Sequence, residues 1–125
     1  SIMRSKYGDY PEYHTSLDDL KNVVTPLGLF GGYIVIKKVL EALENNCLPK
    51  VTFLAEPHLS KRNLYPTLSM KNSASNIKVM LDLISHSDGN TSLLNIAKKI
   101  NVPIWSLYSK LNILLKNKLI KIKSL

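Results

Sequence analysis

The stretch "LLNIAKKINVPIWSLYSKLNILLKNKLIKI", residues 93–122, decides the fold of the second half of the chain. Apolar residues recur at spacings of three and four on both sides of Asn101–Val102–Pro103, which predicts two helices joined by a tight turn. Thr91 or Ser92 is the predicted N-cap of the first helix. The last part, "LIKIK" at 119–123, predicts a short strand.

A further helix is predicted upstream, where Asn76 is the expected N-cap of "IKVMLDLISHS". The order helix, helix, turn, helix, strand is that of a helix-turn-helix followed by the beginning of a wing. Ala97 and the Val102–Pro103 turn strengthen this interpretation, because the stretch resembles winged-helix domains at these positions. The resemblance implies the fold only, since such a scaffold serves either to bind DNA or to dock a protein.

The helix after the turn is the element that would enter a DNA groove. Its predicted outward face offers Lys110 and Asn112 as base readers and Trp105 and Ile113 as apolar contacts. No arginine follows Arg62, and only Ser124–Leu125 follow the strand, so we expect no second wing strand. These features favour a protein-docking role over DNA reading.

Charge and composition narrow the class of protein. Residues 76–125 carry eight lysines against two acidic groups, which suits nucleic acid, an acidic protein surface or simply a solvated lysine-rich surface. The longest apolar run, 26–36, is about half the length of a bilayer span of roughly twenty residues. With a single cysteine, Cys47, no internal disulfide can form, so we expect a cytoplasmic protein without a membrane segment.

The first half predicts a long helix and a strand. Thr25–Pro26 is a strong helix start, and the helix is expected over 26–45 with an apolar stripe along one side. Gly31–Gly32 predicts close packing against a neighbouring element. A strand at 50–56 has no evident partner, so both elements indicate a missing sheet. We predict a mainly α fold with few strands (α+β), divided into domains at 1–72 and 76–125.

The stretch "YPEYHTSLDDL", residues 10–20, contains the most suggestive histidine, His14. His58 is expected in a turn and His86 at a helix end, so neither is an evident partner for His14. Zinc needs several converging ligands, so the chain cannot build a closed metal site by itself.

The stretches "IMRSKYGDYPEYHTSLDDL" and "AEPHLSKRNLYPTLS", at 2–20 and 55–69, closely resemble the C-terminal part of bacterial aminopeptidase-like zinc proteins assigned to polysaccharide biosynthesis. The resemblance implies that His14 is the terminal ligand of one zinc in a two-metal centre. The remaining ligands and the general base then lie upstream of Ser1.

Other residues receive candidate roles from this resemblance. Asp18 and Asp19 would hold the second imidazole nitrogen of His14 or cap the loop, and Tyr7 and Tyr13 would line a substrate pocket or pack. The pair Lys61–Arg62 would contact an anionic substrate group or belong to a solvated turn.

The combined expectation is a C-terminal fragment of a zinc-dependent aminopeptidase-like hydrolase that is inactive and metal-free in isolation. Its expected partners are the rest of the parent domain, a peptide or aminoacyl substrate and a second copy; nucleic acid is less favoured. The alternative is a winged-helix module that binds DNA or another protein.

Overall fold

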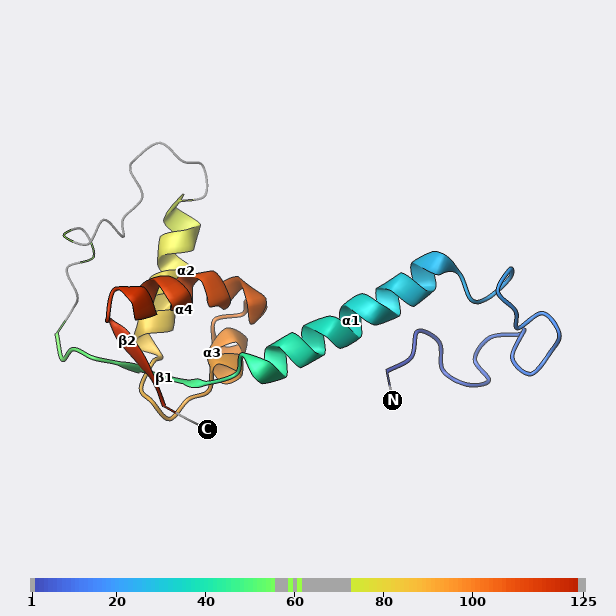
Figure 1. Cartoon of the computed structure of the whole chain (residues 1–125), viewed down its shortest axis with the longest axis horizontal. Helices are drawn as coiled ribbons and strands as arrows, with labels where there is room; N and C mark the ends of the chain where they lie inside the picture. The colour runs from blue at the N-terminus through green and yellow to red at the C-terminus, as the bar shows by residue number, and fades with distance from the viewer. Residues whose placement is uncertain (1, 56–58, 60, 62–72, 124–125) are drawn as a thin grey trace. The chain divides into compact units, whose positions relative to one another are not determined.

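The computed structural model describes residues 2–55, 59, 61 and 73–123. The chain forms two compact units, Ser1–Glu44 and Asn45–Leu125, which we call the N-terminal unit and the winged unit. The elements along the chain are shown in Figure 1: α1 (Pro26–Glu44), β1 (Leu48–Val51), α2 (Ser73–Ser85), α3 (Leu93–Lys99), α4 (Trp105–Lys116) and β2 (Ile120–Lys123). The fold is therefore mainly helical with a small sheet, as the sequence predicts.

The N-terminal unit consists of a series of turns over residues 2–25, the turn region, followed by α1. The hydroxyl of Thr25 accepts a hydrogen bond from the Gly28 N–H at 3.1 Å, and its carbonyl accepts from the Leu29 N–H at 3.0 Å. Proline at the first helical position lacks an N–H that would otherwise stay unpaired. The predicted start at Thr25–Pro26 is confirmed.

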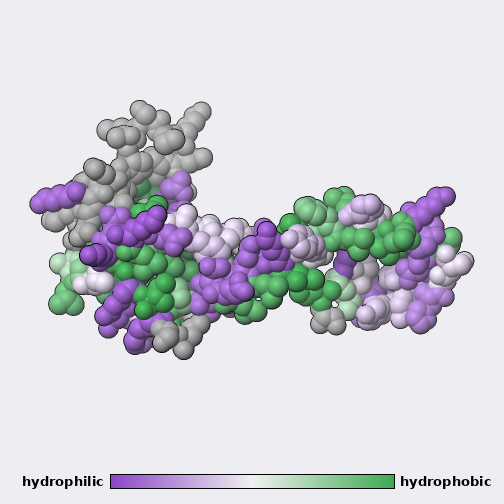
Figure 2. All heavy atoms as spheres, in the orientation of Figure 1, coloured by the Kyte–Doolittle hydropathy of each residue, from purple (hydrophilic) through white to green (hydrophobic). Residues whose placement is uncertain are grey.

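Helix α1 has no buried residue, although its sequence is strongly apolar. Figure 2 shows apolar side chains gathered over this helix. The predicted stripe is exposed along its whole length: Leu29, Tyr33, Ile36, Leu40 and Leu43. A Cβ built at Gly31 or Gly32 meets no atom within 4 Å, so the close packing predicted there is absent from the described structure. Among the described residues no helix is both long and apolar enough to cross a bilayer.

The winged unit begins with the strand that the sequence left without a partner. β1 pairs antiparallel with β2, with Lys50 opposite Lys121 and Val51 opposite Ile120. We call this pair the ribbon. The ribbon corrects two features of the predicted strand: the strand has a partner within the chain, and it spans Leu48–Val51 instead of 50–56. The division between units, at 44/45, accordingly differs from the predicted one at 72–76.

Three helices and the ribbon enclose the core of the winged unit. The apolar side chains with the least exposure come from α2, α3 and α4: Leu83, Leu93, Ile96, Leu107 and Leu114. Each belongs to the apolar face that helical periodicity assigns to its helix. Burying this face is the main force that holds the unit together.

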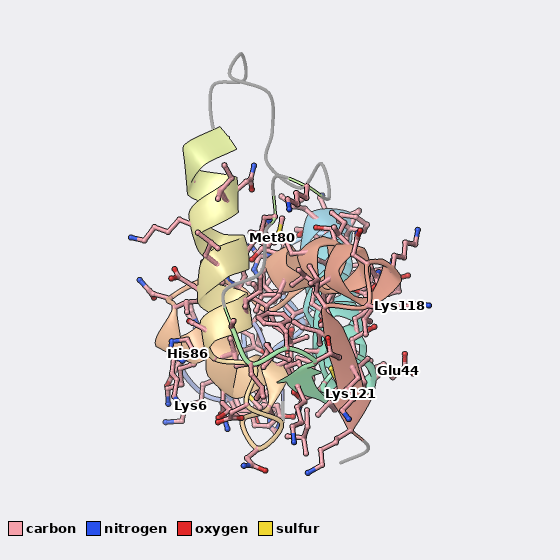
Figure 3. All side chains as sticks on the ribbon, turned by 90° about the vertical axis from the view of Figure 1, so that its left-hand side faces the viewer. Lys6, Glu44, Met80, His86, Lys118 and Lys121 are labelled. Atoms are coloured by element: carbon pink, nitrogen blue, oxygen red, sulfur yellow. The ribbon has the colours of Figure 1, made fainter. Side chains whose placement is uncertain are left out.

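The starts of the helices test the predicted caps. The Ser92 hydroxyl accepts from the Asn95 N–H at 3.3 Å, so Ser92 is the cap of α3, whereas the Thr91 hydroxyl donates to Asp88 at 3.0 Å. α2 begins at Ser73, so Asn76 lies inside the helix and its predicted role as a cap is wrong. The turn before α4 is closed by Asn101, whose φ is 56°. Figure 3 shows Lys118 and Lys121 on the outside of this unit.

Candidate functional site

The turn region holds His14 in an unusual backbone conformation. Its φ is 60°, in the left-handed region, where L-residues lose about 1–2 kcal/mol. The exposed imidazole stacks on the ring of Tyr13, with centroids 4.1 Å apart and an interplanar angle of 24°. A strained residue with a fixed ring is a reasonable place to look for function.

Tyrosines gather around the same point. Tyr13 contacts Tyr7 at 5.9 Å and Tyr10 edge-on at 5.6 Å between centroids, so the three rings and His14 form one aromatic cluster. Offset and edge-on ring pairs each stabilise a fold by about 0.5–1.5 kcal/mol. The cluster therefore gives Tyr7 and Tyr13 a packing role, and Tyr13 is the ring that contacts the imidazole.

Asp18 and Asp19 serve the turns in which they lie. Asp18 accepts a hydrogen bond from the Tyr10 hydroxyl at 3.1 Å, and desolvation together with this bond raises the pKa of Tyr10. Asp19 accepts from the Asn22 N–H at 2.7 Å and the Lys21 N–H at 2.9 Å. The backbone bond from Asn22 is the largest cause of the lowered pKa of Asp19. Of its two predicted roles, Asp19 therefore performs the capping one.

The described residues do not by themselves form a zinc site. Within the part of the chain that the structure describes, no group of three or more His, Cys, Asp or Glu side chains could hold a metal ion. Burial raises the pKa of the Cys47 thiol, which disfavours the thiolate that a metal needs. His14 offers one ligand, so no catalytic step is assigned to this chain.

Of the other histidines and basic residues singled out in the sequence, the structure describes Lys61 and His86. Lys61 is exposed, while Arg62 and His58 lie outside the described residues. His86 is half-buried just after α2, in the winged unit.

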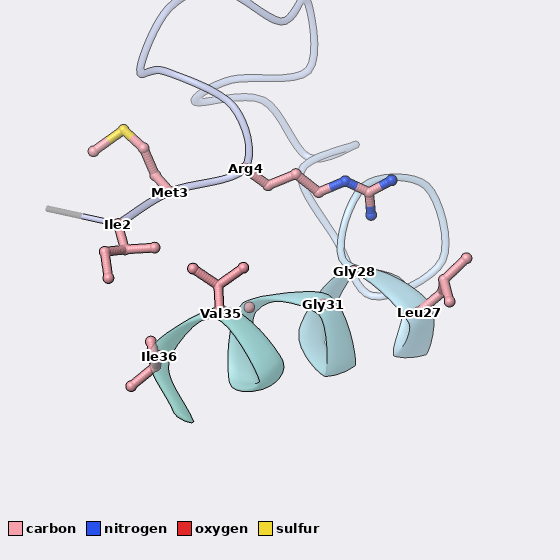
Figure 4. Close-up of a pocket in the computed structure, with 9 residues that line it drawn as sticks. Ile2, Met3, Arg4, Leu27, Gly28, Gly31, Val35 and Ile36 are labelled. Carbon is pink, nitrogen blue, oxygen red and sulfur yellow. The ribbon is translucent and has the colours of Figure 1, made fainter. Parts of the chain in front are cut away.

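A groove of about 430 Å³ runs along the glycine face of α1 (Figure 4). Its floor is the backbone at Gly28, Gly31 and Gly32, and its walls include Met3 and Val35. A smaller cavity of about 220 Å³ beside it includes Tyr10, Asp18 and Arg4, but neither cavity is lined by His14. Gly31–Gly32 predicted close packing against a neighbouring element, and the spacing Gly28-x-x-Gly31 was the signal for the groove.

The outer side of α4 carries the predicted contacts of the winged unit. Trp105 and Ile113 are 48% and 38% exposed, and Asn112 is exposed as well. Lys110 differs from the prediction because it is half-buried, and its ammonium donates to the Ser106 carbonyl at 3.3 Å along the helix. Asn112 is thus the one predicted base reader that faces fully outward.

The net charge differs between the two units. Residues 45–125 contain twelve Lys and Arg and three Asp and Glu, whereas residues 1–44 contain five basic and six acidic residues. The whole excess positive charge therefore belongs to the winged unit.

Comparison with known proteins follows the same division. Residues 47–122 match a family described as winged helix-turn-helix. The chain belongs to the winged helix-turn-helix family. Residues 1–46 match a domain of unknown function, DUF4910, so the border between the two family matches lies near the border between the units of the winged helix-turn-helix protein.

One solved structure aligns over nearly the whole chain. It is a crystal structure of a "putative peptidase" from Clostridium acetobutylicum, with 30% identity, a TM-score of 0.80 and coverage of 97% of this chain. The alignment covers 26% of that protein, so this chain spans about a quarter of its length. No curated protein matches the chain.

Proposed function

We propose that this chain is the C-terminal part of a zinc-dependent, aminopeptidase-like hydrolase. The observation that carries the proposal is the alignment of 97% of the chain with one quarter of the Clostridium acetobutylicum protein. That alignment includes both units, so the turn region and the winged unit occur together in a longer peptidase-like protein.

His14 is the residue that we propose to contribute to the metal centre. It is exposed, its backbone is held at a φ of 60°, and its ring is oriented by Tyr13. An imidazole that is already stacked on a neighbouring ring loses less rotamer freedom when it binds a metal, which favours ligation. The ligands that complete the centre are proposed to lie outside these 125 residues.

The apolar surface of the N-terminal unit supports the same proposal. A helix with exposed side chains on a broad apolar face is normally covered by neighbouring structure. We propose that the rest of the peptidase-like domain covers α1 and its groove, and that a second copy does so when the chain is isolated. The isolated chain is then catalytically inactive and metal-free.

The proposal also names a substrate class, a cellular location and a role for the winged unit. The substrate class is a peptide or another aminoacyl amide, in a cytoplasmic protein linked to polysaccharide biosynthesis. The winged unit is proposed to dock a protein partner, because α4 presents Trp105 and Ile113 outward while Asn112 is the one predicted base reader that is fully exposed there.

The test uses the longer protein that contains this chain, with His14→Ala and the matched control His86→Ala. Zinc content is measured by mass spectrometry, and activity is measured on an aminoacyl p-nitroanilide. We expect His14→Ala to lose activity and to bind less zinc, while His86→Ala keeps both because it lies in the winged unit. An unchanged zinc content in His14→Ala contradicts the proposal.

A further inference from the structure

Strand β2 has a partner on one edge only. Its antiparallel partner β1 is occupied on both sides, because the Val51 N–H donates to the Ser87 carbonyl at 2.9 Å and the Pro49 carbonyl accepts from the Gly89 N–H at 2.9 Å. In the described part of the chain the sheet contains only β1 and β2. The second edge of β2 is therefore open there.

The register shows which backbone groups face this open edge. The Thr52 N–H donates to the Leu119 carbonyl at 3.1 Å, so the Thr52–Leu119 pair is hydrogen-bonded across the ribbon. Bonded and non-bonded pairs alternate along an antiparallel ladder. Hence Lys121 and Lys123 direct their backbone groups toward β1, and Ile122 directs its N–H and carbonyl outward.

The side chains of the ribbon differ between its two faces. Lys50, Lys121 and Lys123 share one face, all are exposed, and the register sets Lys50 directly opposite Lys121. Like charges placed opposite each other destabilise a sheet. The carboxylate of the nearby Asp88 accepts bonds from Asn90 and Thr91 in its own turn.

The opposite face of β2 is apolar. Ile120 is buried there, while Ile122 remains 49% exposed beside the open edge. A strand added at this edge would place alternate side chains on the two faces. One set would meet the lysines and the other would meet Ile122.

We propose that the open edge of β2 binds an extended segment of another protein as an added strand, with acidic residues at every second position and apolar residues between them. Backbone hydrogen bonds from Ile122 give the affinity of such a complex, and the two faces of the ribbon give its specificity. The net positive charge of the winged unit draws an acidic segment toward this edge.

Two other occupants fit the edge less well. A second copy of β2 would bring its own lysines beside Lys121 and Lys123, and lysines on an edge strand are a common means of preventing such pairing. A nucleic acid would use the lysines through its phosphates. It would leave the outward backbone groups and the apolar contact at Ile122 unused.

The probe is an eight-residue peptide that alternates glutamate and valine, compared with a lysine–valine peptide of the same length. Binding of each peptide to the chain is measured by calorimetry. The wild type is expected to bind the acidic peptide and not the basic one. Lys121→Glu with Lys123→Glu should reverse this preference, and Lys98→Glu with Lys99→Glu, which makes the same charge change on α3, should preserve it.

A second variant tests the added strand itself. Ile122→Pro removes the outward N–H without removing a bond of the ladder, because Ile122 does not donate to β1. Loss of this bond should weaken binding of the acidic peptide about tenfold. In the wild type, the same peptide should slow hydrogen exchange at the Ile122 amide.

Three results would overturn the proposal. The first is binding of the acidic peptide with no slowing of exchange at Ile122. The second is an equal loss of binding in the α3 charge variant, which would show an effect of net charge alone. The third is displacement of the peptide by a single-stranded oligonucleotide that binds Ile122→Pro as tightly as it binds the wild type. That result would identify the lysines as a phosphate site.

Discussion

Replacement of Gly89 by alanine should strongly destabilise the winged unit. Gly89 has a φ of 82°, which an alanine adopts at a cost of about 1–2 kcal/mol. A Cβ at this position would also lie 2.9–3.1 Å from three side-chain carbons of Lys50, including the Cβ, which cannot move without the strand. Overpacking of this kind costs typically 1–3 kcal/mol, so the expected loss is about 2–5 kcal/mol.

That loss is large compared with the stability of a small domain. A unit of this size is expected to have a free energy of unfolding on the order of 4–12 kcal/mol and to lose at least 4 °C in Tm per kcal/mol. Gly89→Ala should therefore lower the Tm by about 10 °C or more. Thermal unfolding is followed by the fluorescence of Trp105, the single tryptophan of the chain, which reports on the winged unit.

The matched control is Gly31→Ala, which makes the same chemical change inside α1. A Cβ at Gly31 meets nothing within 4 Å, and alanine is favoured over glycine in a helix by about 1 kcal/mol. The control should leave the Trp105 transition unchanged. If Gly89→Ala unfolds within 1–2 °C of the wild type (a shift of roughly 0.3 kcal/mol), the reasoning about the Gly89 turn is refuted.

Three further predictions concern the winged unit. Leu107→Ala should cost about 2–5 kcal/mol in urea unfolding because Leu107 has no exposed surface, and a cost below about 1 kcal/mol would contradict its central place in the core. Ser92→Ala should cost about 0.5–2 kcal/mol by removing the cap of α3, whereas Thr91→Val should leave the cap in place. Backbone bonds from Asn90 and then Thr91 lower the pKa of Asp88 from 3.8 to about 2. Stability from Asp88 is therefore complete above pH 3.8 and lost as the pH falls toward 2, and Asp88→Asn should flatten a plot of Tm against pH in that window.

The helices of the winged unit were predictable because their signals are local. The apolar spacing on both sides of Val102–Pro103 gives α3 and α4, and Ser92 was one of two caps considered. The prediction of Asn76 as a cap was wrong because α2 begins upstream, at Ser73. A polar residue before an apolar run has the same sequence pattern as a cap. Local patterns locate helices better than they locate helix ends.

The ribbon was not predictable because its pairing is not local. β1 and β2 are separated by nearly the whole winged unit, and no short-range pattern sets their register. The strand was predicted at 50–56, whereas β1 spans Leu48–Val51 and includes Pro49, which lacks a donor. In the structure the Pro49 carbonyl accepts from the Gly89 N–H, and this bond ties that turn to the strand.

The candidate site was predictable only in part. The sequence drew attention to His14 and named Tyr7, Tyr13, Asp18 and Asp19 around it. The structure stacks Tyr13 on His14 and sets Tyr7 against Tyr13, and it uses the two carboxylates within their turns. Spacing along the chain could not distinguish these outcomes, because they depend on how the turn region folds back on itself.

The proposed role of His14 is tested most directly by crystallography of the longer protein at the zinc absorption edge. Anomalous density should show a zinc ion whose distance to an imidazole nitrogen of His14 is about 2.0–2.1 Å. A zinc centre whose ligands do not include His14 would contradict the account.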